Sequence, residues 1–206
     1  QANSPEAVAS IVVKTVQAIT GLNRVMVYKL DHDYSGAVIA EAIREPEPIE
    51  ENFLGLRFPA TDIPAQARQL YLQNWLRLIP DVSYEPVALI PERHPHTQRP
   101  TDLGAAELRS VSPMHVEYLQ NMGVRASMSI SLIVEGRLWG LIACHHPEPR
   151  YIDYEMRKAC EILGQLTSVE LFHQQTLLEK QYQAQVRAIQ QQIRQTISQL
   201  QPAHAS

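Results

Sequence analysis

The chain has 206 residues, of which 45% are hydrophobic and 19% charged, so it can bury the core of one domain and is not expected to be disordered. Its net charge of −4, without a block of like charges, argues against nucleic acid or a membrane surface as the main partner. No apolar run approaches the about 20 residues that span a bilayer. Cys144 and Cys160 are interpreted as buried groups of a reduced, cytoplasmic protein, and the start at Gln1 predicts a fragment or a processed chain.

The first elements in chain order are a helix and a hairpin. Ser4, followed by proline, is typical of a helix start, and Gly21 of a helix end. The β-branched residues 24–30 and the apolar residues 37–43 predict two strands joined by a turn. The acidic, proline-bearing residues 45–51 predict a loop.

A second helix is expected after an acid that lies between two prolines. Pro64 suits the first turn of a helix running to about Leu76, with Thr61 or Asp62 near its cap. Two interpretations of Asp62 stay open on this pattern alone. Its carboxylate can cap the helix, or its backbone can be held rigid for a ligand by Pro59 and Pro64.

Residues 80–103 carry five prolines and predict at most a short strand near Val87. Ser112, again followed by proline, predicts a helix that Gly123 closes.

The last third of the chain predicts a hairpin and a long helix. Residues 126–134 and 137–146 are apolar runs around a Glu-Gly turn, and Asp153 opens a helical pattern that continues to about Leu200. Hairpins rather than βαβ units predict an α+β fold, in which helices pack on an antiparallel sheet.

The far end of the long helix has a pattern of its own. Apolar or uncharged residues recur there at heptad spacing, namely Val186, Ile193 and Leu200, interleaved with Tyr182, Ile189 and Thr196. This pattern fits a marginal coiled coil, and equally an amphipathic helix that leads into another domain. We therefore divide the chain into a domain at 1–175 and a helical extension at 176–206.

An enzyme is not expected. The chain has no glycine-rich phosphate loop and no nucleophile elbow. Cys144 and His145 are neighbours on a strand, so their side chains point to opposite faces and cannot pair, and the same holds for His145 and His146 as metal ligands. His94 and His96 lie in a loop without a further ligand at suitable spacing.

Polar residues occupy positions where a core is expected. Ser127, Ser129 and Ser131 share one strand face, which taken alone fits a solvent-exposed face. In the paired strand, however, His145 is expected to share its face with apolar residues, namely Trp139, Leu141 and Ala143.

Other polar groups come from outside the hairpin. His115 and Tyr118 are neighbours on one helix side, and Arg77 and Arg109 can bind carboxylates. Taken together with the serines and His145, they predict a pocket for a flat, largely apolar ligand that carries carboxylates.

Four stretches carry a family resemblance: "FPATDIPAQARQLY", "LRSVSPMHVEYLQNMGV", "ASMSISLIV" and "LWGLIACHH". Over about residues 5–175 the chain resembles the chromophore-binding GAF domain of phytochromes, in particular of bacteriophytochromes. The resemblance implies a sheet of five or six antiparallel strands and a non-enzymatic red/far-red light sensor. Such a sensor binds a linear tetrapyrrole (a bilin) and signals by Z/E photoisomerisation. It also implies a downstream PHY and histidine kinase module. The helical extension adds the expectation of a homodimer formed through helices.

The resemblance also implies roles for individual residues. The backbone carbonyl of Asp62 accepts hydrogen bonds from the inner pyrrole N–H groups, and Ile63 packs near the pyrrole plane. His115 contacts the central pyrroles through water, and His145 lies near the outer D ring. The aromatic residues around that ring are Tyr28, Phe58 and Tyr118. The propionates are held by Arg77 and Arg109, with help from Tyr71, Ser112, Ser127 and Ser129.

One position departs from the plant-type pattern. Met114 stands where many phytochromes carry the cysteine that forms a thioether to the bilin, and a methionine cannot act as a thiolate nucleophile. Cys144 is expected to face away from His145, and Cys160 lies on the long helix. We therefore expect non-covalent binding of biliverdin, or of another bilin such as phycocyanobilin.

Two other functions remain open on the sequence. One is a GAF domain for a different small molecule, such as a cyclic nucleotide. The other is a dimerisation module with an empty pocket, for which the heptads would be the main feature.

Overall fold

The computed structural model describes residues 4–44 and 52–200. The first helix, α1 (Pro5–Thr20), begins and ends where the sequence predicts. The hydroxyl of Ser4 accepts a hydrogen bond from the backbone N–H of Ala7 at 3.2 Å, and Gly21 closes the helix with a left-handed φ of 64°. The predicted loop at 45–51 lies outside the described residues.

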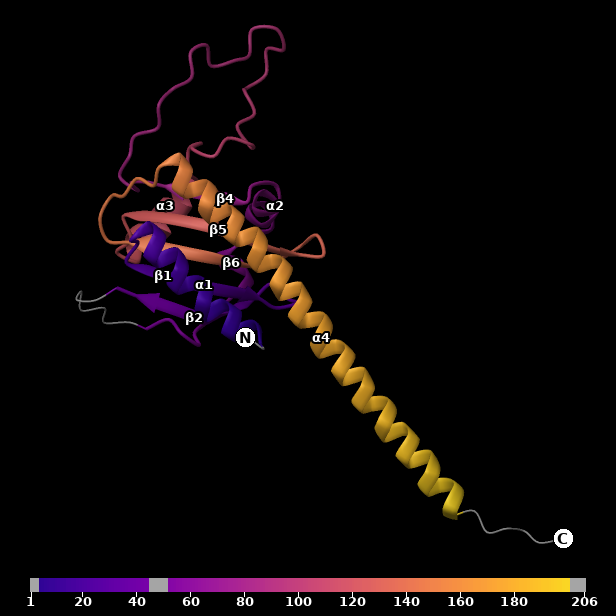
Figure 1. The fold of residues 1–206 in the computed structure, drawn as a ribbon. Helices are drawn as coiled ribbons and strands as arrows, with labels where there is room; N and C mark the ends of the chain where they lie inside the picture. The colour runs from indigo at the N-terminus through magenta and orange to yellow at the C-terminus, as the bar shows by residue number, and fades with distance from the viewer. Residues whose placement is uncertain (1–3, 45–51, 201–206) are drawn as a thin grey trace, which may run out of the picture.

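A single antiparallel sheet forms the centre of the described part of the chain (Figure 1). Its six strands follow the order β3-β2-β1-β6-β5-β4, which confirms the predicted α+β fold. The strands are β1 (Arg24–Leu30), β2 (Gly36–Ile43), β3 (Arg57–Phe58), β4 (Leu76–Ile79), β5 (Ala126–Val134) and β6 (Arg137–His146).

The two longest helices, α1 and α4 (Tyr154–Leu200), lie side by side on one face of the sheet (Figure 1). Between them and the strands lies the main core, which includes Val13, Met128 and Ile142, each without exposed surface. The alternation of β5 assigns Met128 to this face and directs the serines to the other. Shorter helices, α2 (Ala65–Gln73) and α3 (Pro113–Asn121), flank that other side.

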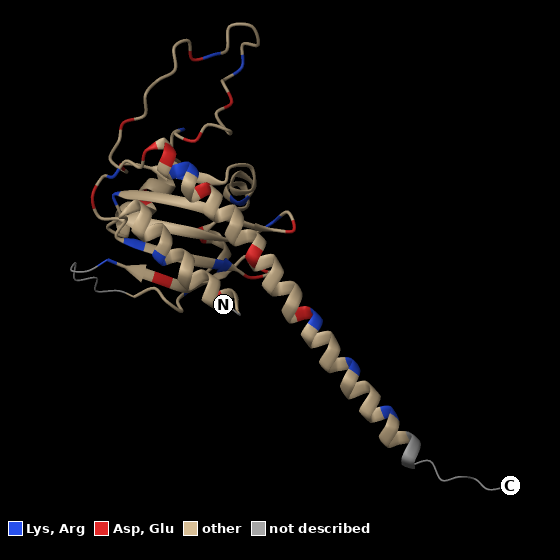
Figure 2. Ribbon diagram, in the orientation of Figure 1, with Lys and Arg blue, Asp and Glu red and all other residues tan. Residues whose placement is uncertain are grey.

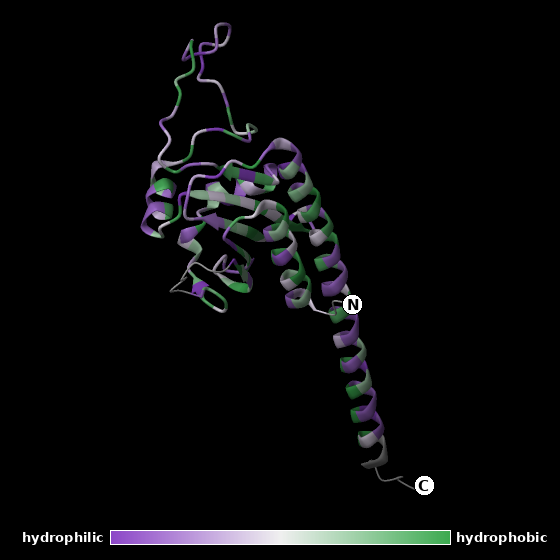
Figure 3. Ribbon diagram, turned by 60° about the vertical axis from the view of Figure 1, so that its left-hand side comes forward, coloured by the Kyte–Doolittle hydropathy of each residue, from purple (hydrophilic) through white to green (hydrophobic). Residues whose placement is uncertain are grey.

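Helix α4 begins as predicted, because the Asp153 carboxylate accepts a hydrogen bond from the Met156 N–H at 2.8 Å. Its second half projects beyond the sheet, and hydrophobic residues recur along it (Figure 3). Tyr182 and Ile189 are exposed there, and the side chain of Leu200 lies outside the described residues. The heptad residues that are described therefore have no core to pack against within this chain.

The second predicted helix is too long. Helix α2 ends at Gln73, and residues Leu76–Ile79, the first of which was assigned to the helix, form the edge strand β4. These residues pair with Ser127–Ile130 of β5, so a tertiary contact that local spacing cannot reveal overrides the helical pattern.

The capping prediction is also wrong. Pro64 occupies the N-cap position of α2, and no side chain caps the helix. Asp62 instead ends a short 3₁₀ turn, η1 (Ala60–Asp62). Its carboxylate is therefore free of a capping role in α2.

The long connection between β4 and α3 loops away from the sheet (Figure 1). Val87 is 90% exposed and belongs to no strand, so the short strand predicted there is wrong. Within residues 80–111 the pairing is limited to one isolated bridge between Arg93 and Pro100.

The face assigned to Trp139 also differs from the prediction. The pairing of β5 with β6 shifts by one residue between Leu132 and Ile133, which leaves Trp139 as an extra residue in β6. Trp139 therefore packs in the main core with Cys144, whereas Leu141 lies on the opposite face.

Candidate functional site

Two adjoining cavities open on the serine side of the sheet, with volumes of about 110 and 530 Å³. Seven residues line both of them, so they form one continuous site. These shared residues are Asp62, Ile63, Tyr71, His115, Tyr118, Ser127 and Ser129. The combined size suits a ligand larger than a single ring system.

The structure brings together all fourteen residues singled out from the sequence. Besides the shared residues, Tyr28, Phe58 and His145 line the smaller cavity. The larger cavity is lined by Arg77, Arg109, Ser112 and Met114. Met114 is 80% exposed and lies at the rim.

Aromatic rings enclose the smaller cavity. Tyr28 and Phe58 meet edge to face with ring centroids 6.0 Å apart, and the Tyr28 hydroxyl donates to the Phe58 carbonyl at 3.4 Å. Phe53 adds a further edge-to-face contact with Phe58 at 6.3 Å. Burial, followed by the negative charge of Asp62, raises the pKa of Tyr28 to about 12, so the phenol stays protonated.

Helix α3 carries a second ring pair into the site. His115 and Tyr118 stack with centroids 6.1 Å apart and planes inclined by 12°. Burial lowers the pKa of His115, and the nearby Arg77 guanidinium lowers it further. The imidazole is therefore neutral at pH 7 and can act as both donor and acceptor.

His145 presents an unpaired polar atom at the site. Its Nδ1 is buried and has no hydrogen-bond partner among the described residues. Burial, with the Arg24 guanidinium as the next cause, lowers the pKa of His145 to about 4. Since a buried unpaired polar atom is costly, this ring fits a ligand that supplies a polar partner.

Two guanidinium groups give the larger cavity a positive wall. Arg77 extends from β4 and donates hydrogen bonds to the backbone carbonyl of Glu107 at 2.6 Å and to that of Arg109. Arg109 donates to the Ala106 carbonyl at 2.9 Å. Burial lowers the pKa of Arg77 to about 10, which leaves it charged at neutral pH. This wall suits carboxylates.

The turn that holds Asp62 is fixed by an arginine. The guanidinium of Arg68 donates to the Ile63 carbonyl at 2.5 Å and to the Ala60 carbonyl at 3.5 Å. The Asp62 carboxylate is close enough to Tyr118 to raise its pKa, after the larger effect of burial. The rigid-backbone interpretation of Asp62 thus has a structural basis that the capping interpretation lacks.

Some of the cavity wall was missed in the sequence analysis. Met26 and Val38 line the smaller cavity from the strands. The alternation of β1 could have assigned Met26 to the face of Tyr28, whereas Val38 reaches that face only because the pairing of β1 with β2 shifts by one residue at Ile39. Phe53 also lines it, from a loop segment without periodicity.

Both cysteines lie away from the site. Cys144 and Cys160 are free thiols buried in the main core, on the α1 and α4 side of the sheet. Burial raises the pKa of both, which further suppresses their nucleophilic thiolate form. No cluster of three or more metal-ligating side chains occurs within residues 4–44 and 52–200.

These features define a ligand-binding domain of the GAF type. A GAF domain model matches residues 4–171, and the chain belongs to the GAF domain family. It is 51% identical over 191 residues to cyanobacterial phytochrome B of Nostoc sp., covering 93% of this chain, and 51% identical over 166 residues to a bacteriophytochrome of Pseudomonas aeruginosa, covering 81%. The chain spans about a quarter of the length of these curated relatives, 25% and 22% respectively.

Solved structures show the same likeness. The chromophore-binding domain of an unusual bacteriophytochrome from R. palustris superimposes with a TM-score of 0.81 at 42% identity, over 85% of this chain and 58% of that chain. That of Stigmatella aurantiaca bacteriophytochrome, as a Thr289His mutant, gives a TM-score of 0.73 at 49% identity, over 81% and 53%. In the described residues, no helix has the length and apolar character needed to cross a membrane.

Proposed function

We propose that this chain is the pigment-binding module of a red/far-red photoreceptor and binds a linear tetrapyrrole in the two adjoining cavities. The observation that carries the proposal is the division of the site into an aromatic end around Tyr28 and Phe58 and a cationic end at Arg77 and Arg109. A bilin has this character, since its ring chain is apolar and its propionates are anionic. When bound, it absorbs visible light and isomerises about a double bond.

Each wall of the site has its own task in this proposal. Arg77 and Arg109 attract the propionates, assisted by the hydroxyls of Ser112, Ser127 and Ser129. The neutral imidazole of His145 offers its unpaired Nδ1 to a polar group at the aromatic end. Asp62 and His115 lie where the two cavities join and face the middle of the ligand.

Binding is proposed to be non-covalent within this chain. Met114 cannot form the thioether that a cysteine would, and both thiols are buried on the far side of the sheet. We propose biliverdin as the ligand, with other bilins such as phycocyanobilin as close alternatives. Mass spectrometry after denaturation checks this, and a bilin adduct on Cys144 or Cys160 would contradict it.

The proposal for the surrounding modules and for association is based partly on the relatives. We propose that the chain acts in a cytoplasmic sensor with a downstream PHY and histidine kinase module. Its boundary at residue 175 is supported by burial, because Leu171 and Gln174 are buried whereas Tyr182 and Ile189 are exposed. We also propose a homodimer formed through helices.

The test is expression of the chain together with a heme oxygenase, followed by absorption spectra before and after red light. A red-absorbing band that changes reversibly on illumination supports the proposal. A colourless protein in the presence of excess biliverdin contradicts it and favours a different small molecule for the same pocket.

A further inference from the structure

The cationic end of the site is tied to the long helix through one residue of the loop before α3. We call residues 106–110 the clamp segment, because their backbone carbonyls receive the side chains of the two cavity arginines. Arg77 donates to the carbonyls of Glu107, Arg109 and Ser110. The guanidinium of Arg109 donates a hydrogen bond within the same segment, to the backbone carbonyl of Ala106 at 2.9 Å.

The side chain of Glu107 points the other way, toward the start of α4. One carboxylate oxygen lies 3.0 Å from Nζ of Lys158, and the other lies 3.4 Å from Nε of Arg157. Basic residues lie next to acidic ones on the first turns of α4 (Figure 2). Hydrogen bonding to Lys158 is the largest cause that lowers the pKa of Glu107, so the carboxylate is ionised at neutral pH.

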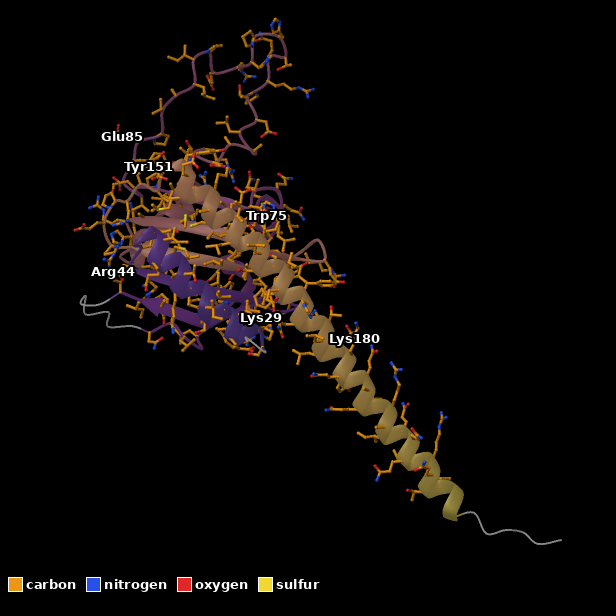
Figure 4. All side chains as sticks on the ribbon, in the orientation of Figure 1. Lys29, Arg44, Trp75, Glu85, Tyr151 and Lys180 are labelled. Atoms are coloured by element: carbon orange, nitrogen blue, oxygen red, sulfur yellow. The ribbon has the colours of Figure 1, made fainter. Side chains whose placement is uncertain are left out.

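The helix end of this link is itself well anchored. The Arg157 side chain is almost fully buried, and its guanidinium donates to the Ile152 carbonyl at 2.6 Å and to the Tyr151 hydroxyl at 3.3 Å. Tyr151 lies just before α4, as Figure 4 shows. A displacement of Glu107 therefore acts on the anchored guanidinium of Arg157 as well as on the partly exposed Lys158.

We infer that Glu107 is a positioning residue that couples the binding of a ligand carboxylate at Arg77 and Arg109 to the start of α4. The inference rests on the proposed function, since the ligand carboxylates are expected to bind Arg77 and Arg109. Arg77 makes three hydrogen bonds to the clamp segment, so a carboxylate that binds this guanidinium competes with the segment for its N–H groups, whereas Arg109 makes one such bond and has further donors for the ligand. A carboxylate held there fixes or shifts residues 106–110, and the Glu107 carboxylate carries that change to Arg157 and Lys158. This route runs through the domain itself and needs no contact from another module.

The experiment is hydrogen exchange of the full chain with and without biliverdin, read at residues 106–110 and 154–164. In the wild type, biliverdin is expected to change exchange at both segments by about fivefold or more, the low end of ordinary coupling between sites. Glu107→Gln should keep the change at 106–110 and reduce that at 154–164 to about twofold or less, because the neutral amide loses the double ion pair.

The matched control is Glu161→Gln. Glu161 also pairs with Lys158, at 2.7 Å, but from the same helix, so its loss leaves the link between loop and helix intact. This variant should retain the full response at 154–164. Lys158→Gln removes one of the two ion pairs from the helix side and leaves that of Arg157, so it should show a partly reduced response and guards against a folding defect in Glu107→Gln.

The remaining outcomes are distinct. A normal response of 154–164 in Glu107→Gln, or an equal loss in Glu161→Gln, overturns the inference. Biliverdin binding to the wild type without any response at α4 also overturns it, yet leaves the proposed function standing. If the wild-type chain binds no biliverdin, both the inference and the proposed function are contradicted.

Discussion

The guanidinium of Arg24 and the carboxylate of Glu41 form an ion pair between neighbouring strands, with Nε and Oε1 3.3 Å apart and both side chains largely buried. The second oxygen of Glu41 accepts the backbone N–H groups of Phe53 and Leu54 at 3.0 and 3.1 Å. The Arg24 guanidinium lies 4.0 Å above the centre of the Phe53 ring. This pair thus fixes the loop that closes the aromatic end of the site.

Glu41→Ala should lower the free energy of unfolding by about 3–5 kcal/mol, because it removes a buried carboxylate that pairs with Arg24 and accepts the backbone N–H groups of Phe53 and Leu54. Urea unfolding measures this. Asp31→Asn is the matched control, since Asp31 pairs with Arg57 at the surface and its loss should cost less than about 1 kcal/mol. If both variants lose the same free energy of unfolding, the buried ion pair contributes no more to stability than the surface pair, which would contradict the prediction.

The stability of the ligand-free chain should depend on pH through His145. Its pKa is about 4 in the folded chain and returns to the ordinary value of 6.5 on unfolding, so the unfolded chain binds more protons between these values. The free energy of unfolding should therefore fall as the pH drops from about 6.5 to about 4, by up to about 3 kcal/mol, and then level off.

His145→Asn should flatten this slope in the same window. His115 contributes in the same direction, so a smaller slope should remain. Thermal unfolding at a series of pH values checks both chains. A slope that is unchanged in His145→Asn would contradict the assignment.

Asp62→Ala should leave the fold intact, within about 0.5 kcal/mol, because Asp62 is partly exposed and caps no helix. Photoconversion should nevertheless be lost and fluorescence should rise, since the carboxylate faces both cavities and acts on Tyr118. Absorption and emission spectra after pigment loading measure this. Normal switching would remove Asp62 from the mechanism.

Arg109→Ala should weaken biliverdin binding by about 1.5–3 kcal/mol, the usual contribution of a charged hydrogen bond. Arg99→Ala is the control, because Arg99 belongs to the same long connection but lines neither of the two main cavities. Titration followed by absorbance gives both affinities. Unchanged binding in Arg109→Ala would place the propionate elsewhere.

Deletion of residues 179–206 should leave the free energy of unfolding of the domain within about 1 kcal/mol of that of the full chain, because the described side chains of this part are exposed, apart from the half-buried Val186. Lys180, for example, points into solvent (Figure 4). Sedimentation of both chains measures association. A dimer that survives the deletion would assign pairing to the outer face of α4 near Leu166 and Val169, which are 61% and 67% exposed.

The sequence determined the elements whose signals are local. Helix α1 follows from Ser4 and Gly21, and the hairpin of β5 and β6 follows from two apolar runs around a tight turn. The fourteen candidate residues, all of which line the two cavities, were also named from the sequence, because twelve of them lie in the four stretches that carry the family resemblance and Tyr28 and Arg77 follow from the same resemblance.

Only the tertiary structure decided the features that depend on distant partners. Leu76–Ile79 became a strand because β5 offered an edge, and Trp139 changed face because of a bulge in the pairing of two strands. The link from Glu107 to Lys158 joins residues that lie 51 positions apart. Local propensity and periodicity act over a few residues, whereas these contacts depend on how the folded chain brings its segments together.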